Sequence, residues 1–326
     1  SASLMTIAPR STFLHLFTII NNRRDVMFIL PDNVTIIEVG PRDGLQNESK
    51  HVHTNNKQVF ITALQRAGIK EMELTSFVSP KWVPQMADAE VIVRGTVPVG
   101  RQFVLAPNAK GAELALEAGA RSVAVFVGVS DSFNTKNINR TTAESMETLT
   151  PVFSRLKEEG VFIRACISTA FYCPYEGKID PQAVIKLCKK FVDMGADELS
   201  VADTIGMANP KESYTLFNLL KEELPNTLLT AHFHDTRKMA IANIYAALQA
   251  GVSRFDSSAG GLGGCPFAPG ATGNVATEDV VNMLDTLGIE TGIDVKKVCE
   301  AVDLIAPHVS RPIDTGMYRL FKNGQL

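Results

Sequence analysis

Short apolar runs rich in β-branched residues recur along the chain, and between them apolar side chains repeat at the helical period. Residues 59–67 and 239–248, for example, gather their apolar positions on one stripe of a helix. Alternating runs of this kind are typical of strands that are each followed by a helix. The pattern predicts eight strands, at residues 34–39, 71–75, 102–106, 122–128, 161–168, 198–202, 228–234 and 254–258.

Glycines at the ends of several predicted helices, each shortly before the next strand, support the same architecture. They are Gly68, Gly119, Gly160, Gly195 and Gly251. Glycine adopts the left-handed conformation that ends a helix and turns the chain back toward a parallel strand. Eight units without a linker predict an α/β fold, a (β/α)₈ TIM barrel with a few additional C-terminal helices. A doubly wound open sheet is the alternative, disfavoured because no GxGxxG follows the first strand.

Composition narrows the functional classes. The 326 residues are 45% hydrophobic and 21% charged, which excludes a disordered or fibrous chain. No apolar run reaches the roughly 18 residues of a membrane span. The net charge is -3 and no dense cluster of lysine and arginine occurs, so neither nucleic acid nor a membrane is an expected partner. A small molecule is the expected partner, and a homodimer is compatible with the chain.

The domain prediction separates an N-terminal extension, residues 1–30, from one barrel domain, residues 31–326. Residues 1–26 contain several serines and threonines and no acid before Asp25, a composition that weakly resembles an organellar transit peptide. The five cysteines are odd in number and form no CxxC, so no disulfide framework or structural zinc site is predicted. We therefore expect a reducing compartment, the cytoplasm, with the mitochondrial matrix as the alternative.

Polar residues gather where the predicted strands end. Arg42 and Asp43 follow the first strand, Glu73 lies in the second, and Asp203 and Thr204 follow the sixth. In a parallel barrel these ends converge on the face where catalytic groups collect. Each residue alone is compatible with an ordinary loop position, but their shared placement predicts an active site.

His232 and His234 are the most specific pair. Side chains two apart on a strand point to the same side, so both imidazoles are expected to face the barrel mouth. With Asp43 and Asn274 nearby, we predict a metal site; a pair of buried histidines satisfied by neighbours is the alternative. Imidazole, carboxylate and amide ligands without an obligatory thiolate favour Mg²⁺ or Mn²⁺ over zinc.

The segment after the eighth strand, residues 260–274, contains six glycines in fifteen residues. It matches neither GxGxxG nor the P-loop pattern, so phosphate binding is a weak interpretation. We predict a mobile lid whose Cys265 thiol gives or takes a proton once the loop closes.

Four motifs resemble those of the 3-hydroxy-3-methylglutaryl-CoA lyase family. They are VGPRDGLQNE at 39–48, TSFVSPKWVPQM at 75–86, CPYEGK at 173–178, and the segment 260–279. Their length and unusual composition make a chance match implausible. The resemblance implies a TIM barrel of a metal-dependent lyase and synthase superfamily, an acyl-CoA substrate and bound Mg²⁺ or Mn²⁺. It also implies cleavage of 3-hydroxy-3-methylglutaryl-CoA to acetyl-CoA and acetoacetate, as in leucine degradation.

Carried over position by position, the resemblance assigns roles to individual residues. It makes Arg42 the group beside the thioester carbonyl, Glu73 a catalytic carboxylate, and Cys265 the loop thiol. It also implies that Asp203 lies near the substrate and that His232 or Cys265 protonates the product carbanion. The implied metal ligands are Asp43, His232, His234 and Asn274.

One position departs from the family pattern. Cys166 stands where the family carries a tyrosine, so the expected substrate-binding residues, Arg42, Cys166 and Thr204, include an unusually small one. A smaller wall would admit another 3-hydroxyacyl-CoA, such as citramalyl-CoA or a branched homologue. Two further alternatives are a Claisen-type synthase of the same superfamily and a catalytically silent scaffold.

Overall fold

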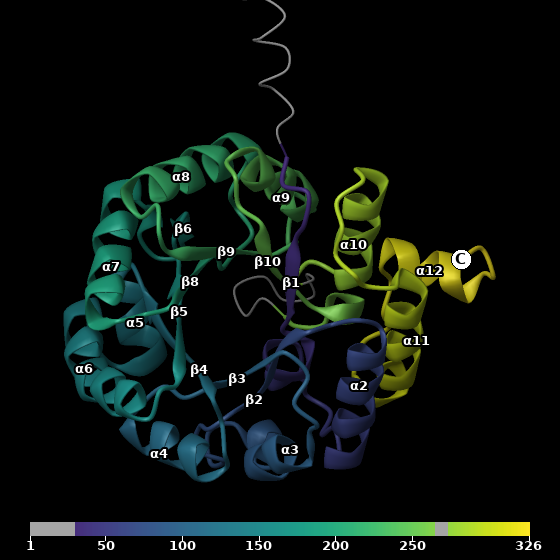
Figure 1. Ribbon diagram of the computed structural model, residues 1–326, viewed down its shortest axis with the longest axis horizontal. Helices are drawn as coiled ribbons and strands as arrows, with labels where there is room; N and C mark the ends of the chain where they lie inside the picture. Colours follow the sequence, from purple (N-terminus) through teal and green to yellow (C-terminus); the bar gives the residue numbers. More distant parts are fainter. Residues whose placement is uncertain (1–29, 265–272) are drawn as a thin grey trace, which may run out of the picture.

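Eight parallel strands form a closed barrel ringed by helices in the computed structural model, which describes residues 30–264 and 273–326 (Figure 1). The strand order is β1-β10-β9-β8-β5-β4-β3-β2, and parallel pairing of β1 with both β2 and β10 closes the barrel. The barrel strands are β1 (Thr35–Glu38), β2 (Glu71–Ser76), β3 (Arg101–Leu105), β4 (Ser122–Gly128), β5 (Phe162–Ser168), β8 (Glu198–Asp203), β9 (Leu228–Phe233) and β10 (Arg254–Ser257).

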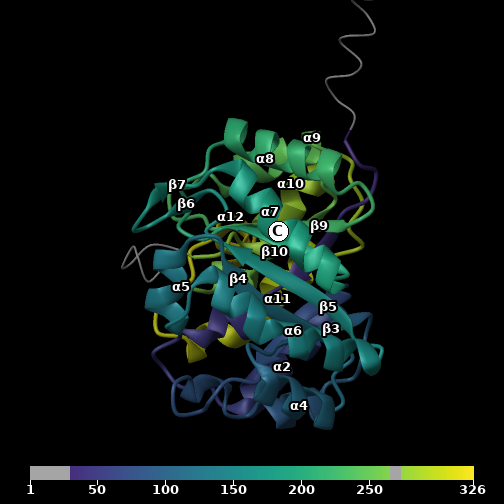
Figure 2. The same ribbon diagram turned by 90° about the vertical axis from the view of Figure 1, so that its left-hand side faces the viewer.

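The helices surround the strands on the outside of the barrel (Figures 1 and 2). α10, α11 and α12 lie together on one side, and α11 packs against α2. None of the helices in the described ranges combines the length and hydropathy that a bilayer crossing requires. The helices are α2 (Thr54–Arg66), α3 (Ala89–Gly95), α4 (Ala109–Glu117), α5 (Asp131–Ile138), α6 (Thr142–Glu158), α7 (Pro181–Met194), α8 (Pro210–Glu223), α9 (Ala240–Gln249), α10 (Thr277–Thr286), α11 (Val295–Ile305) and α12 (Gly316–Lys322).

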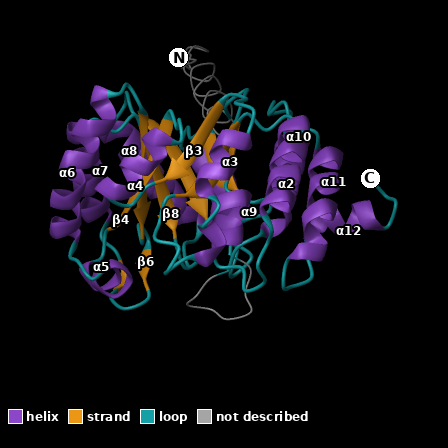
Figure 3. Ribbon diagram, turned by 90° about the horizontal axis from the view of Figure 1, so that it is seen from below, coloured by secondary structure: helices purple, strands orange, loops and turns teal. Residues whose placement is uncertain are grey.

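The predicted barrel and its eight strands are confirmed, each strand ending within two residues of its expected bounds. The five predicted helix-terminal glycines all have positive φ, from 66° to 103°, as a left-handed turn requires. A short hairpin, β6 (Tyr172–Cys173) with β7 (Gly177–Lys178), was not predicted. Figure 3 shows β6 next to α5, at the edge of the barrel.

In strand β5, successive side chains point alternately toward the surrounding helices and into the barrel. Ile163 and Ile167 belong to the apolar core between strands and helices, whereas Arg164 and Cys166 point into the barrel. Inside, oppositely charged side chains from four strands pair with one another beneath the carboxyl ends of the strands. They are Glu71 and Glu73 of β2, Arg164 of β5, Glu198 of β8, and Arg254 and Asp256 of β10.

Candidate active site

A short π-helix, η2 (Gly40–Gly44), follows β1 and carries Arg42 and Asp43. The backbone N–H groups of Asp43 and Gly44 both donate to the Val39 carbonyl, at 2.8 and 3.1 Å. This wide turn holds Asp43 at the barrel mouth. π-Helical turns are rare and often accompany functional sites.

Glu38 anchors the start of this turn. Its buried carboxyl group accepts hydrogen bonds from the N–H groups of Gly40 and Ala259, at 2.8 and 2.9 Å, and from the Thr277 hydroxyl, at 2.6 Å. Burial outweighs these bonds and raises the pKa of Glu38 to about 7. One buried side chain thus joins β1 to the segments after β10.

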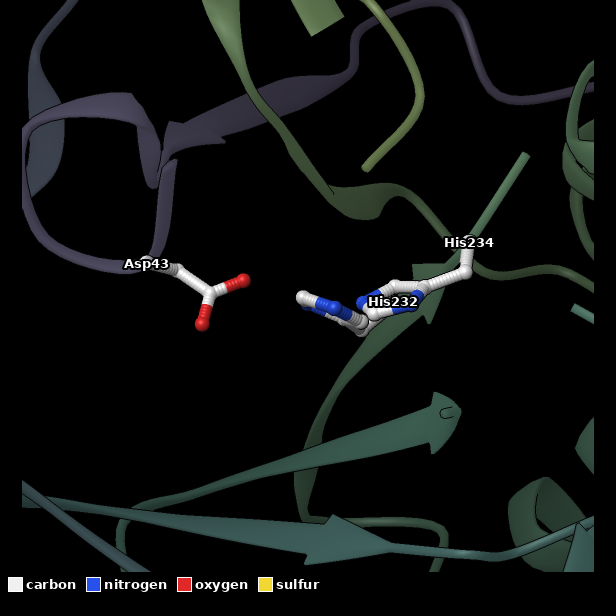
Figure 4. A group of neighbouring side chains, drawn as sticks. All are labelled: Asp43, His232 and His234. Carbon is white, nitrogen blue, oxygen red and sulfur yellow. The ribbon is translucent and has the colours of Figure 1, made fainter. Parts of the chain in front are cut away.

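Asp43, His232 and His234 converge into one group that could hold a metal ion. One ligand atom from each lies within 4.8 Å of the others. Figure 4 shows the Asp43 carboxylate facing the two imidazole rings, whose centroids lie 5.2 Å apart. His232 lies in β9, and His234 directly follows it and bridges to Asn274. The predicted convergence of these three residues is therefore present in the fold.

Burial and neighbouring charges favour the ionised form of Asp43 and the neutral form of His234, the forms that bind metal. Burial alone would raise the pKa of Asp43, but Arg42 and both imidazoles outweigh it and lower that pKa to about 2. Burial and the neighbouring His232 lower the pKa of His234 to about 4. Near neutral pH the site therefore contains a carboxylate and at least one neutral imidazole, both competent to bind a cation.

Asn274 lies directly beside this group. Its amide Nδ2 donates to Asp43 Oδ2 at 2.8 Å and to the Leu262 carbonyl at 3.2 Å. Gly263 makes this approach feasible: at φ 116°, a Cβ atom on it would lie 2.8 Å from Asn274 Nδ2. Asn274 therefore contacts Asp43, another of the predicted metal ligands. Its role as a ligand stays a prediction.

Arg42 connects Asp43 to Glu73. Its Nε donates to Glu73 Oε2 at 2.7 Å, and its Nη1 donates to Asp43 Oδ1 at 2.8 Å. Burial disfavours the charge of Arg42, but Glu73 and Asp43 outweigh this effect and raise its pKa. The guanidinium is thus held as a fixed cation at the barrel mouth.

A pocket of about 280 Å³ lies over these residues. Its polar wall includes Arg42, Glu73 and Thr204, and its remaining wall includes Cys166 and three apolar side chains, of Leu105, Phe126 and Phe133. Burial strongly raises the pKa of the Cys166 thiol, which therefore stays neutral. The predicted substrate-binding residues all line this pocket.

Two predicted site residues remain, Asp203 and Cys265. Asp203 is buried, and its two carboxylate oxygens accept from the N–H groups of Met207 and Ala208, each at 3.0 Å. Burial outweighs these bonds and raises its pKa to about 6. It is not among the residues that line the pocket, and its proximity to substrate stays a prediction. Cys265 lies outside the described residues.

Asp256, Arg164 and Ser200 reach the site from inside the barrel, and sequence reasoning did not single them out. His232 Nδ1 lies 2.9 Å from Asp256 Oδ2, and Arg164 contacts the other oxygen of the same carboxylate. The sequence does contain one signal that could have pointed to Asp256. It is an acidic residue inside a predicted strand, two positions after Arg254.

The HMGL-like family model matches residues 33–305. The chain belongs to the HMGL-like family. Rattus norvegicus 3-hydroxy-3-methylglutaryl-CoA lyase, cytoplasmic, is 46% identical over 284 residues, 86% of this chain and 83% of that protein. Homo sapiens hydroxymethylglutaryl-CoA lyase, mitochondrial, is 46% identical over 287 residues, 87% and 88% of the two chains.

The chain is also similar to a solved structure that contains coenzyme A. The HMG-CoA lyase of Acinetobacter baumannii, in complex with coenzyme A and 3-methylmalate, superimposes with a TM-score of 0.84 at 36% identity. The match covers 90% of this HMGL-like chain and 96% of that one. The family resemblance expected from the sequence motifs is confirmed.

Proposed function

We propose that this HMGL-like protein is a divalent-metal-dependent lyase that cleaves 3-hydroxy-3-methylglutaryl-CoA to acetyl-CoA and acetoacetate. The observation that carries the proposal is the group formed by Asp43, His232 and His234 beside the Arg42–Glu73 pair, in one pocket. The names of its relatives agree with this reaction. An acyl-CoA is accordingly the proposed substrate class.

The residues present fit a hard divalent cation, Mg²⁺ or Mn²⁺. His234 Nδ1 is buried and has no hydrogen-bond partner among the described residues, as expected where a cation belongs beside the ring. Asp43, His232, His234 and Asn274 would hold the ion, and no thiolate is required. When bound, the cation supplies Lewis-acid polarisation of the substrate's tertiary hydroxyl.

The cleavage balances as a retro-Claisen step. A base takes the hydroxyl proton, the C2–C3 bond breaks, and the hydroxyl carbon becomes the ketone of acetoacetate. The electron pair of the broken bond becomes the enolate of acetyl-CoA. The Cys265 thiol is the proposed donor of a proton to C2 of this enolate, because both nitrogens of His232 are engaged, Nδ1 with Asp256 and Nε2 toward the cation.

Arg42 stabilises the enolate oxygen. Arginine has five N–H donors, so after its bonds to Glu73 and Asp43 the two Nη atoms still have N–H groups for the thioester oxygen. A charge-assisted hydrogen bond strengthens as negative charge develops on that oxygen. Glu73 acts here by fixing the orientation of the guanidinium.

Cys166 favours a second candidate substrate. Together with Leu105, Phe126 and Phe133 it forms a wall of the pocket that is neutral and mostly apolar. A small side chain in this wall would leave space for a larger, branched acyl group. A branched homologue, or the smaller citramalyl-CoA, would then undergo the same bond cleavage.

One assay tests the reaction, the metal and the substrate. The purified protein with Mn²⁺ or Mg²⁺ is expected to form acetoacetate from 3-hydroxy-3-methylglutaryl-CoA, and chelation followed by readdition of metal should abolish and restore turnover. If only citramalyl-CoA is cleaved, it replaces 3-hydroxy-3-methylglutaryl-CoA as the proposed substrate. No product from either thioester, with or without metal, would overturn the proposal and favour a silent scaffold.

The relatives include proteins named cytoplasmic and mitochondrial, and we propose the cytoplasm for this one. Fractionation of cells that express the full chain with a C-terminal tag distinguishes the two. Sedimentation velocity tests the proposed homodimer, for which a monomeric mass would be the contrary result.

A further inference from the structure

The two sides of the metal-binding group are connected behind the site by a continuous chain of charged contacts. Each member contacts the next, and together they come from η2, β2, β5, β10 and β9. The chain runs Asp43, Arg42, Glu73, Arg164, Asp256 and His232. We propose that Asp256 is a positioning residue for His232: it fixes the tautomer and the ring orientation that a cation requires.

The contact with Asp256 determines which ring nitrogen of His232 carries the proton. Asp256 Oδ1 contacts the Arg164 guanidinium, and Oδ2 accepts from the Ser200 hydroxyl at 2.9 Å. A carboxylate paired with a guanidinium is ionised and accepts hydrogen bonds only. His232 Nδ1, 2.9 Å from Oδ2, is therefore the donor. In the neutral imidazole this leaves the Nε2 lone pair for a ligand.

Arg164 makes this carboxylate a fixed element. Its side chain is fully buried and touches acids from three other strands, Glu73, Glu198 and Asp256. Arg164 Nη1 lies 3.2 Å from Glu73 Oε1, and the other oxygen of Glu73 accepts from Arg42. The buried guanidinium of Arg164 therefore orients both Asp256, which contacts His232, and Glu73, which contacts Arg42.

His234 provides the contrast within the same site. No described side chain fixes its tautomer, because its buried Nδ1 has no hydrogen-bond partner among the described residues. The two proposed histidine ligands thus differ in one respect that can be measured: in the described part of the chain, only His232 is hydrogen-bonded to a carboxylate. A carboxylate that accepts from a ligating histidine typically contributes about 10- to 100-fold to metal affinity.

The test is Asp256→Asn, which preserves the size of the side chain and removes its charge. In protein stripped of metal and labelled with ¹⁵N-histidine, long-range ¹H–¹⁵N spectra recorded at a pH where the ring is neutral should show wild-type His232 with its proton on Nδ1. The variant should show a mixture of tautomers at His232 and no change at His234. Calorimetric titration with Mn²⁺ should give a Kd about 10- to 100-fold higher than that of the wild type.

Asp303→Asn is the matched control, because it removes a carboxylate that binds Tyr318 and Lys322 on the C-terminal helices. It should leave the His232 tautomer and the Kd for Mn²⁺ unchanged. If Asp256→Asn fails to fold, Ser200→Ala removes one hydrogen bond from the same carboxylate and should shift both readouts in the same direction, by less. An unchanged tautomer together with an unchanged Kd in Asp256→Asn would overturn the proposal.

The metal part of this inference rests on the proposed function, whereas the tautomer measurement does not. Wild-type protein that binds no Mn²⁺ would reject the metal site and leave the role of Asp256 to be judged from the spectra alone. Wild-type protein that binds Mn²⁺ with His232 protonated on Nε2 would reject the positioning role and leave the metal site standing.

Discussion

Arg42 shows how much a single side chain at the barrel mouth determines. It lies between the carboxylates of Asp43 and Glu73, and donates to each through a different nitrogen. Only a planar guanidinium can make both contacts and still offer donors to a substrate oxygen. Lysine retains the charge but not this geometry.

Arg42→Lys should therefore reduce kcat by about 100- to 1000-fold, the usual effect of losing a donor to a developing oxyanion. Binding of Mn²⁺ should change much less, because Asp43 and both histidines remain. Steady-state kinetics and calorimetry measure the two effects separately. Arg101→Lys, the same change at the start of β3, should keep kcat within about twofold; an equal loss in both variants would contradict the assignment.

At the scale of elements, Glu38 joins β1 to the segments that follow β10, through contacts with Ala259 and Thr277. Its pKa of about 7 lies above the ordinary value of 4.5. Between these two values the folded protein keeps a proton that the unfolded chain releases. The contribution of Glu38 to stability therefore falls as the pH rises from about 4.5 to about 7.

Glu38→Gln should remove this dependence, because glutamine accepts the same backbone hydrogen bonds and carries no charge. The free energy of unfolding of the variant relative to the wild type should increase between pH 5 and pH 8, by an amount on the order of 3 kcal/mol. Urea titrations at several pH values measure it. A constant difference across this range would show that Glu38 is ionised throughout.

The strands were predictable because each is a run of apolar, β-branched residues, and five of the eight follow one of the predicted helix-terminal glycines. The π-helix after β1 and the β6–β7 hairpin were not, because elements of two to five residues leave no periodic pattern. Asp43, His232 and His234 could be found from their positions at strand ends. Asp256 could not be connected to Arg164, since 92 positions separate them and only barrel closure brings them together.

At the scale of the whole molecule, the proposed metal ligands come from the first barrel strand and from the last two, which are neighbours only because the barrel closes. Asp43 follows β1, His232 and His234 belong to the β9 region, and Asn274 follows β10. A cation that binds all four therefore joins segments on both sides of the β1–β10 seam. Because the cation binds the folded protein and not the unfolded chain, its binding must stabilise the entire fold.

Mn²⁺ at about 100 times its Kd should stabilise the wild-type protein by about 2.7 kcal/mol and raise its Tm accordingly. Asp43→Asn should abolish most of this shift, because it removes the carboxylate from the group. Differential scanning fluorimetry with a Mn²⁺ series measures it. The same rise in Tm in wild type and variant would place the stabilising ion elsewhere on the protein.

The paired charges inside the barrel also limit how the protein can be engineered. Arg164 alone touches acids on β2, β8 and β10, and a buried ion that loses its partner typically destabilises a protein by about 3–5 kcal/mol. A library that randomises one strand at a time would therefore return mostly unfolded clones at these positions. Variants with a new interior will be recovered only when residues on several strands are exchanged together.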